Sequence, residues 1–248
     1  MTAVPQPILV RPQSRVLGRN GLMDKYFYFA MSLLVAVVVV WGFSHSVNQN
    51  LLHAAPPRPA LLWIHAAAFS TWVVFFILQS ALIRTHHVRI HRSLGWFGAA
   101  LGTVMVPLGI TTAIVMARFD TVRLHQPGAD AFLIEPLFDM LAFGICFALA
   151  ILWRKKPEFH RRLIFIATVI LLDAAFGRIL YLFNNNLFFP CLDAVILLGV
   201  GRDLLVNRRV HVVYRIALPV LILSQVFVNY TWRSAPSWWI STAHSILS

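Results

Sequence analysis

Long apolar stretches alternate with short polar connections along the whole chain. A helix needs about 20 predominantly apolar residues to cross the hydrocarbon core of a bilayer. The stretches predict membrane spans at 26–47, 59–83, 95–117, 132–153, 163–184, 189–206 and 211–231. Because the connections are short, each span returns directly to its neighbour. The pattern therefore predicts an all-α membrane protein, a seven-transmembrane-helix bundle built as one helix plus three helical hairpins.

The same pattern divides the chain into three parts. A basic tail at 1–25 is followed by the seven-helix transmembrane domain at 26–231 and by a C-terminal tail at 232–248. The first apolar stretch is too long for the apolar region of a cleaved signal peptide, so we expect it to be retained as a helix. The composition agrees, since 59% of the 248 residues are hydrophobic and only 12% are charged. Soluble domains are about half apolar and about a quarter charged, so composition alone favours a membrane protein.

Basic residues gather on one side of the predicted membrane. The initial tail and the second, fourth and sixth connections hold most of them: Arg11, Arg15, Arg19, Lys25, Arg84, Arg89, Arg92, Arg154, Lys155, Lys156, Arg161, Arg162, Arg202, Arg208 and Arg209. The opposite side holds Arg58, Arg118, Arg123 and Arg233. The positive-inside rule then predicts a cytoplasmic N-terminus and an extracytoplasmic C-terminus. The same bias accounts for the net charge of +12 through contact with anionic lipids of the bilayer, and no basic soluble face indicates a nucleic-acid partner.

Histidine–arginine pairs lie where two basic connections lead into the next predicted helix. These pairs are His91-Arg92 and His160-Arg161, and His211 repeats the placement. Helix N-termini bind phosphate through their free N–H groups, so one hypothesis is an anionic lipid head group or a phosphorylated ligand held by these pairs. The alternative is that the basic residues only set the topology and contact lipid. Haem ligation by His91 and His160 is disfavoured, because axial ligands are normally set inside a pocket.

Short motifs follow one another between residues 60 and 180. They are His65 and Gln79, the run His91-Arg92-Ser93-Leu94-Gly95, the run Glu158-Phe159-His160-Arg161-Arg162-Leu163, and Arg178. This arrangement resembles a family of bacterial multi-pass predicted membrane proteins of unknown function. The resemblance implies a protein of the bacterial inner (plasma) membrane, and it carries no activity with it.

Ionisable residues inside the spans fall at similar depths. The residues are His65, Glu135, Asp139, Asp173, Arg178 and Asp193. At 1.5 Å per residue most of them lie within roughly 6–10 Å of the outer surface, with Asp173 nearer the midplane. A charged side chain near the centre of a span costs about 2.5–3.5 kcal/mol, so these groups should face the interior of the bundle and pair. We expect Arg178 to pair with Asp139 or Asp193.

The acids in this layer outnumber its permanent cation. Glu135, Asp139, Asp173 and Asp193 stand against the single guanidinium of Arg178. Some carboxylates must therefore be protonated, hydrated in an outward-facing pocket, or neutralised by a bound cation. The sequence predicts a protein that binds or transports protons or a small cationic solute, with the six residues of the layer forming its site.

Two other functions stay open at this stage. One is a haem- or metal-dependent membrane redox protein, in which His45, His65 and a carboxylate would hold iron or zinc. The other is a structural or assembly subunit, in which the polar layer fixes the helix register. The chain has no GxSxG motif, no Walker loop and no Rossmann glycines, so its sequence indicates no soluble-enzyme chemistry and no particular cofactor.

An aromatic stripe marks one face of the second predicted span. The residues on this face are His65, Phe69, Trp72, Phe76 and Gln79. They could form the wall of a ligand pocket. The competing interpretation is an ordinary packing seam between helices, which is the more usual role of large apolar stripes.

Overall fold

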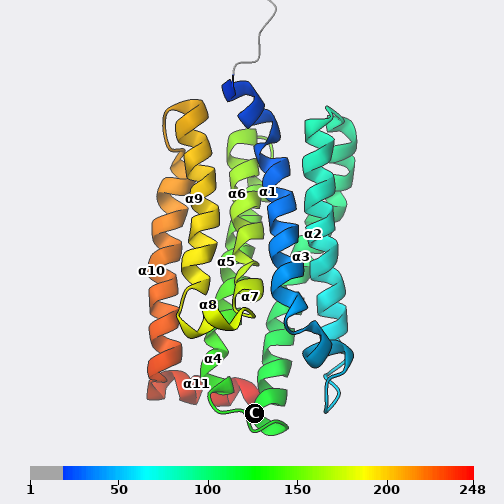
Figure 1. Cartoon of the computed structure of the whole chain (residues 1–248). Helices are drawn as coiled ribbons and strands as arrows, with labels where there is room; N and C mark the ends of the chain where they lie inside the picture. Colours follow the sequence, from blue (N-terminus) through cyan, green and yellow to red (C-terminus); the bar gives the residue numbers. More distant parts are fainter. Residues whose placement is uncertain (1–18) are drawn as a thin grey trace, which may run out of the picture.

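The computed structural model describes residues 19–248, and within that range the chain is helical with no strand (Figure 1). The long helices are α1 (Arg19–Ser44), α2 (Leu61–Arg84), α3 (Val88–Val122), α5 (Ile134–Leu152), α6 (Pro157–Ile170), α9 (Phe188–Asn207), α10 (Val212–Ser234) and α11 (Ser237–Leu247). The short ones are η1 (Asn48–Leu52), α4 (Ala129–Phe132), α7 (Asp173–Phe176) and α8 (Leu180–Asn184). The predicted all-helical fold is confirmed.

Five segments among these residues are long and apolar enough to cross a membrane. They are Gly21–Ser44, Leu61–Arg84, Val88–Val122, Ala129–Leu152 and Val212–Ser234. The sixth predicted span, 189–206, coincides with α9, which is 20 residues long and carries Asp193, Arg202 and Asp203. Length and composition thus agree with a multi-pass membrane protein, and they give five spans rather than the full set of seven.

The fifth predicted span, 163–184, is broken. α6 ends at Ile170, and the chain continues through the short helices α7 and α8. The backbone N–H of Leu172 donates to the Val169 carbonyl at 2.9 Å, a tighter turn than an α-helix makes. Ile179 is extended, with φ −87° and ψ 103°, and redirects the chain before α8. The prediction of one continuous helix is wrong here, because an apolar run specifies burial but not unbroken backbone hydrogen bonding.

The C-terminal tail of the prediction is a helix packed on the bundle. α10 continues to Ser234, and α11 then lies across the end of the bundle (Figure 1). The indole Nε1 of Trp239 donates to the Ala131 carbonyl at 2.9 Å. Trp239 and Ala243 are buried against Leu133. α11 therefore covers the region where α4 leads into α5.

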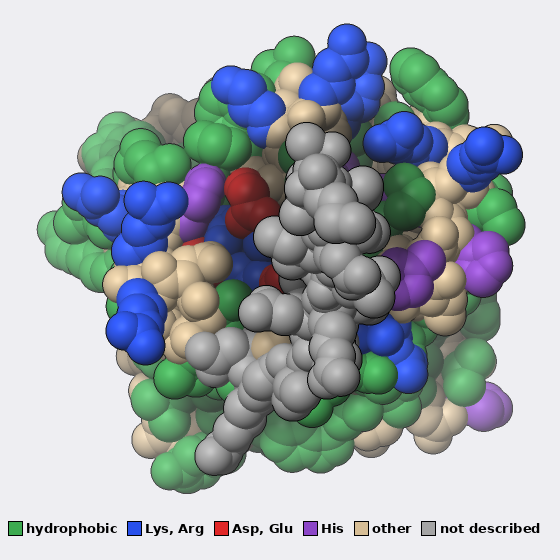
Figure 2. Space-filling view, turned by 90° about the horizontal axis from the view of Figure 1, so that it is seen from above, with side chains coloured by type: hydrophobic (Ala, Val, Ile, Leu, Met, Phe, Trp, Pro, Cys, Tyr) green, Lys and Arg blue, Asp and Glu red, His purple; other side chains and the backbone are tan. Residues whose placement is uncertain are grey.

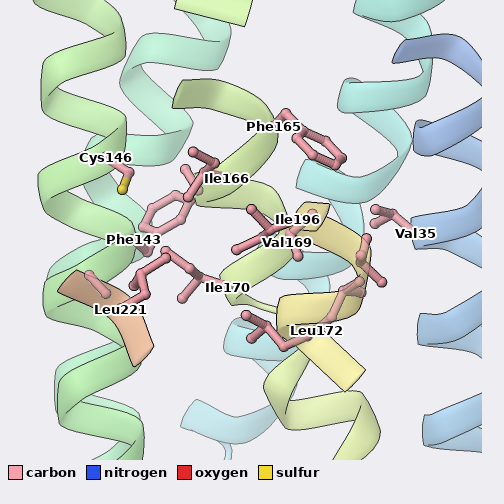
Figure 3. Packing of buried hydrophobic residues seen from close by; sticks show 14 of the residues in the cluster. Val35, Phe143, Cys146, Phe165, Ile166, Val169, Ile170, Leu172, Ile196 and Leu221 are labelled. Atoms are coloured by element: carbon pink, nitrogen blue, oxygen red, sulfur yellow. The ribbon is translucent and has the colours of Figure 1, made fainter. Parts of the chain in front are cut away.

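α6 runs through the middle of the bundle. Its residues Phe165, Ile166 and Val169 have no exposed surface. Figure 3 shows Phe143 of α5 and Ile196 of α9 among the side chains packed with them. Lipid tails are as apolar as these side chains, so close packing rather than transfer out of water holds such a core together within a bilayer.

α1 packs against the backbone of α7 at one glycine. A Cβ added to Gly42 would overlap the carbonyl oxygen of Ala175. Gly42 itself is buried. Because Gly42 has no side chain, α1 approaches α7 closely, and this contact holds the broken segment next to α1.

The two ends of the bundle differ in charge. We call one the α1 end, where α1 begins and where the α2–α3, α5–α6 and α9–α10 connections lie, and the other the α11 end (Figure 1). Figure 2 shows Lys and Arg side chains around the face of the α1 end. The basic connections identified from the sequence thus lie together. Arg11 and Arg15 lie outside the described residues, as does most of the predicted basic tail.

Candidate functional site

Three carboxyl groups meet inside the bundle. Glu135 and Asp139 lie one turn apart on α5, and Asp173 is the first residue of α7. One oxygen of each lies within 4.8 Å of the others. The three residues are 7%, 5% and 1% exposed, respectively. We call Glu135, Asp139 and Asp173 the carboxyl cluster.

Three oxygens of the carboxyl cluster lack hydrogen-bond partners among the described residues. Both side-chain oxygens of Asp173 and Oδ1 of Asp139 are buried and receive no hydrogen bond from any residue that the structure describes. A buried, unsatisfied carboxylate is costly, and buried polar atoms in proteins are nearly always paired. These oxygens therefore call for protons, water or a cation.

The local backbone explains how Asp173 reaches the α5 acids. The helix break after Ile170 starts a new turn at Asp173, and the close approach of Gly42 to Ala175 supports that turn from α1. Irregular backbone at membrane depth is tolerated where it is buried in protein or lines a water-filled cavity. In transporters, broken helices of this kind supply binding sites. The break thus coincides with the residue whose oxygens are unsatisfied.

Arg178 lies beside the carboxyl cluster without forming an ion pair. It is half-buried, donates to the carbonyl oxygen of Ala174, and stacks on the ring of Phe43 with its Cζ 4.1 Å from the ring centroid. Within the described part of the chain, neither Asp139 nor Asp193 forms an ion pair with it, so the predicted pairing is wrong. The electrostatic influence of its charge still reaches Glu135. A helical wheel could not show this, because the bend at Gly177–Ile179 sets the direction of the side chain.

The other predicted members of the polar layer are dispersed around this centre. Asp193 of α9 is half-buried and accepts a hydrogen bond from Gln225 Nε2 at 3.2 Å. His65 stacks on Phe69, with ring centroids 4.0 Å apart, and its Nδ1 is buried without a partner among the described residues. The charge of Arg178 also acts on the imidazole of His65.

The donor set that the structure brings together contains no histidine. Among residues 19–248, the group with metal-binding geometry is Glu135, Asp139 and Asp173. His45 is exposed and pairs its Nδ1 with the Trp41 carbonyl at 2.8 Å. The two-histidine, one-carboxylate arrangement considered from the sequence is therefore not assembled.

The middle of the aromatic stripe of α2 is a packing seam. Trp72 and Phe76 are buried. The indole of Trp72 donates to Thr168 Oγ1 at 3.3 Å and packs edge-on against Phe143 and Phe147 of α5. This part of the stripe joins α2 to α5 and α6 and leaves no wall exposed to a ligand.

A second set of charges lies at the α1 end, and its core is fully buried. We call it the ionic cluster; its members are Asp24, Glu158, Arg161, Arg162, Arg202 and Asp203. Arg162 of α6 binds Asp203 of α9 with two N–H groups, and Arg202 donates to the same carboxylate at 2.8 Å. None of these three residues is more than 2% exposed.

The rim of the ionic cluster completes its charge balance. Asp24 of α1 pairs with Arg202 and, at 3.4 Å, with Arg161. Glu158 pairs with Arg161 at 2.7 Å and with Arg162 at 2.6 Å. Burial acts to raise the pKa of Glu158, but the hydrogen bond from Arg162 and the charges of both arginines outweigh it, and the pKa falls below its usual range. Three arginines thus neutralise three acids.

The residues expected to hold lipid or an anion have different surroundings. Arg161 is paired with acids, and Arg92 is exposed. His160 pairs its Nδ1 with the Ala150 carbonyl at 2.9 Å, and Nδ1 of His91 is buried without a partner among the described residues. The ionic cluster was missed from the sequence. The adjacent pair Arg202-Asp203 at the end of an apolar stretch is the available signal, whereas Asp24 falls within the predicted basic tail at 1–25.

No family model, no curated protein and no solved structure matches the chain. The resemblance to bacterial membrane proteins of unknown function therefore stays a prediction. A function is inferred below from the chemistry of the carboxyl cluster.

Proposed function

We propose that the protein is a multi-pass membrane protein that binds protons or a small inorganic cation at the carboxyl cluster and moves them across the bilayer. One observation supports this above all. Three buried carboxyl groups lie within 4.8 Å of one another, and three of their oxygens have no partner in the described part of the chain. Such an arrangement is stable only with positive charge added to it.

Electrostatics distinguishes this role from a structural one. Like charges at this distance in a low-dielectric interior repel strongly, so three ionised carboxylates cannot stay together unaided. A scaffold would be better served by apolar side chains or by balanced pairs. Intramembrane acids typically mark ion pathways and proton relays.

The spacing of the oxygens restricts the solute. Three atoms that lie within 4.8 Å of one another enclose room for protons, a water molecule or a single inorganic ion. An organic cation would require the α5 and α7 acids to separate. We therefore narrow the solute from a small cation in general to protons or an inorganic ion.

The proposed topology determines which side of the membrane the carboxyl cluster is nearer. We propose seven crossings, with α6, α7 and α8 together forming the fifth and α9 the sixth, in the inner membrane of a bacterium. The basic α1 end then faces the cytoplasm, where its exposed arginines contact anionic lipid head groups. In this proposed topology the carboxyl cluster, at the start of α5 and in the break after α6, lies in the outer half of the membrane.

Transport in reconstituted vesicles tests the proposal. Purified protein in liposomes that contain a pH-sensitive dye should carry protons when a gradient of pH or of an inorganic cation is imposed. Asp173→Asn removes the acid whose two oxygens receive no hydrogen bond from a described residue, and it should abolish the flux. Asp130→Asn is the matched control, because Asp130 is an acid near the same end that pairs with the exposed His244 at 3.0 Å.

Two results would overturn the proposal. One is a wild-type protein that carries neither protons nor inorganic cations in correctly assembled vesicles. The other is a flux that survives Asp173→Asn unchanged.

A further inference from the structure

The charge of the carboxyl cluster defines what must balance it. Three ionised carboxylates carry three negative charges. Arg178 is the permanent cation whose charge reaches Glu135, and it offsets one of them. Two negative charges remain in a buried site, so neutrality requires either two protons or one divalent cation.

The donor atoms restrict the kind of cation. Every potential ligand in the cluster is a carboxylate oxygen. Oxygen donors select hard cations such as Mg²⁺, Ca²⁺ and Mn²⁺, whereas zinc and copper sites in proteins usually contain histidine or cysteine. No imidazole or thiol belongs to this group among residues 19–248.

The size of the cluster restricts the cation further. Because no two of the three oxygens are more than 4.8 Å apart, a position exists that lies within about 2.8 Å of all of them. Calcium binds oxygen at about 2.3–2.6 Å in flexible geometry, while magnesium demands about 2.0–2.1 Å and a near-ideal octahedron. A small inward movement of the side chains therefore suits an ion of the calcium or manganese class better than magnesium.

Asp173 supplies independent support for a bound ion. It is 1% exposed, it comes from a different segment than the two α5 acids, and neither of its oxygens receives a hydrogen bond from a described residue. An acid that served only packing would be satisfied by a neighbouring donor. Both oxygens of Asp173 thus remain available for coordination.

We propose that the carboxyl cluster binds one hard divalent cation and releases two protons for each ion bound. This inference rests on the proposed function and specifies its solute. Two carboxyl O–H bonds break, both protons pass to water, and the ion takes their place at the oxygens. No electron is transferred, and the net charge of the site is the same in both states.

The surrounding elements contribute few other charges. α2 presents His65. α9 presents Asp193, whose charge reaches Asp173. Asp193 is half-buried and hydrogen-bonded to Gln225 of α10, and because it takes no part in the exchange its charge is the same with protons bound as with the ion bound. α1 covers Arg178 with the apolar ring of Phe43. α3 has no ionisable residue between Arg92 and Arg118.

Titration with Mn²⁺ alone tests the stoichiometry. Free Mn²⁺ is followed by electron paramagnetic resonance in weakly buffered detergent solution, and a pH indicator counts the protons released. We expect saturable binding of one Mn²⁺ per chain, release of two protons, and displacement by Ca²⁺. Asp173→Asn should weaken binding at least tenfold and lower the proton count to one, while Asp130→Asn should match the wild type.

The outcomes separate this inference from the proposed function. Absence of saturable Mn²⁺ binding, or binding without proton release, overturns the exchange even if vesicles still carry protons. Stoichiometric exchange in detergent without flux in vesicles overturns transport and leaves the metal site. Asp139→Asn provides the same test if Asp173→Asn does not fold.

Discussion

The carboxyl cluster and the ionic cluster are both buried sets of charges, and they lie toward opposite ends of α6. Arg162 is near the start of this helix, and Asp173 follows its end. In the ionic cluster every acid is paired with arginine. In the carboxyl cluster the acids form no ion pair with any residue that the structure describes.

The pairing of its acids determines what each cluster can do. A guanidinium keeps its proton under all ordinary conditions, so the arginines of the ionic cluster are permanently charged and neutralise the acids paired with them. A carboxyl group gains or loses a proton and can exchange it for a metal ion. The ionic cluster therefore joins α1, α6 and α9, whereas the acids of the carboxyl cluster have the chemistry to bind protons or an inorganic cation.

The largest expected effect comes from breaking the buried pair in the ionic cluster. Asp203→Asn leaves Arg162 and Arg202 buried without their shared counter-charge. Unpairing a buried ion pair in this way costs about 3–5 kcal/mol. Thermal unfolding in detergent, followed by circular dichroism, measures the loss. Arg209 is exposed on the connection that follows α9, so Arg209→Gln should change stability little. A small loss of stability in Asp203→Asn would contradict the structural role of the ionic cluster.

A smaller effect is expected where α1 supports the break. Gly42→Ala places a methyl group against the Ala175 carbonyl and must shift α7, which costs about 1–3 kcal/mol by overpacking. Because α7 carries Asp173, Mn²⁺ binding should weaken as well. Gly201→Ala on α9 has open space around the added carbon and serves as the control. Thermal unfolding and Mn²⁺ titration of both variants measure these effects. Unchanged Mn²⁺ binding in Gly42→Ala would show that the position of α7 does not control the binding site.

Neutralising an acid of the carboxyl cluster should hardly change stability. Asparagine has nearly the shape of a protonated aspartic acid, so Asp139→Asn removes like-charge repulsion without creating a cavity. We expect the free energy of unfolding in metal-free solution to change by less than about 1 kcal/mol. Chemical or thermal unfolding checks this. A loss as large as that of Asp203→Asn would make the two clusters equivalent and remove the contrast between them.

The smallest effect is a pH dependence in the ionic cluster. The pKa of Glu158 is lowered in the folded protein, so its pairing stabilises the fold above the pKa of the unfolded chain. That contribution is lost as the pH falls through the folded pKa. The Glu158 side chain is 53% exposed, so the change is small. Melting curves below neutral pH should show a slightly weaker acid dependence in Glu158→Gln than in the wild type, and identical curves would argue against the pairing.

Local spacing predicted part of the carboxyl cluster. Glu135 and Asp139 share a face by their separation of four residues, whereas counting depth along a continuous span puts Asp173 nearer the midplane. These inferences use distances within one helix or along the membrane normal, and the structure brings the three acids together.

Contacts between segments could not be predicted in the same way. The ionic cluster joins Asp24, Arg162 and Asp203 from three helices, and such contacts depend on how each helix is rotated about its axis. The bend at Ile179 redirected Arg178 away from its expected partners, and a hydropathy pattern records no such bend. Sequence periodicity therefore specified depth and face but not the pairing of side chains.

The enclosure of α6 by protein has a consequence for how the molecule responds to its membrane. Outer helices tilt or stretch when bilayer thickness changes, because their apolar length must match the lipid around them. A segment surrounded by other helices experiences no such demand. Thinner or thicker lipid should therefore leave the distance between the carboxyl cluster and the ionic cluster nearly constant, whatever the sterol content or chain length of the membrane.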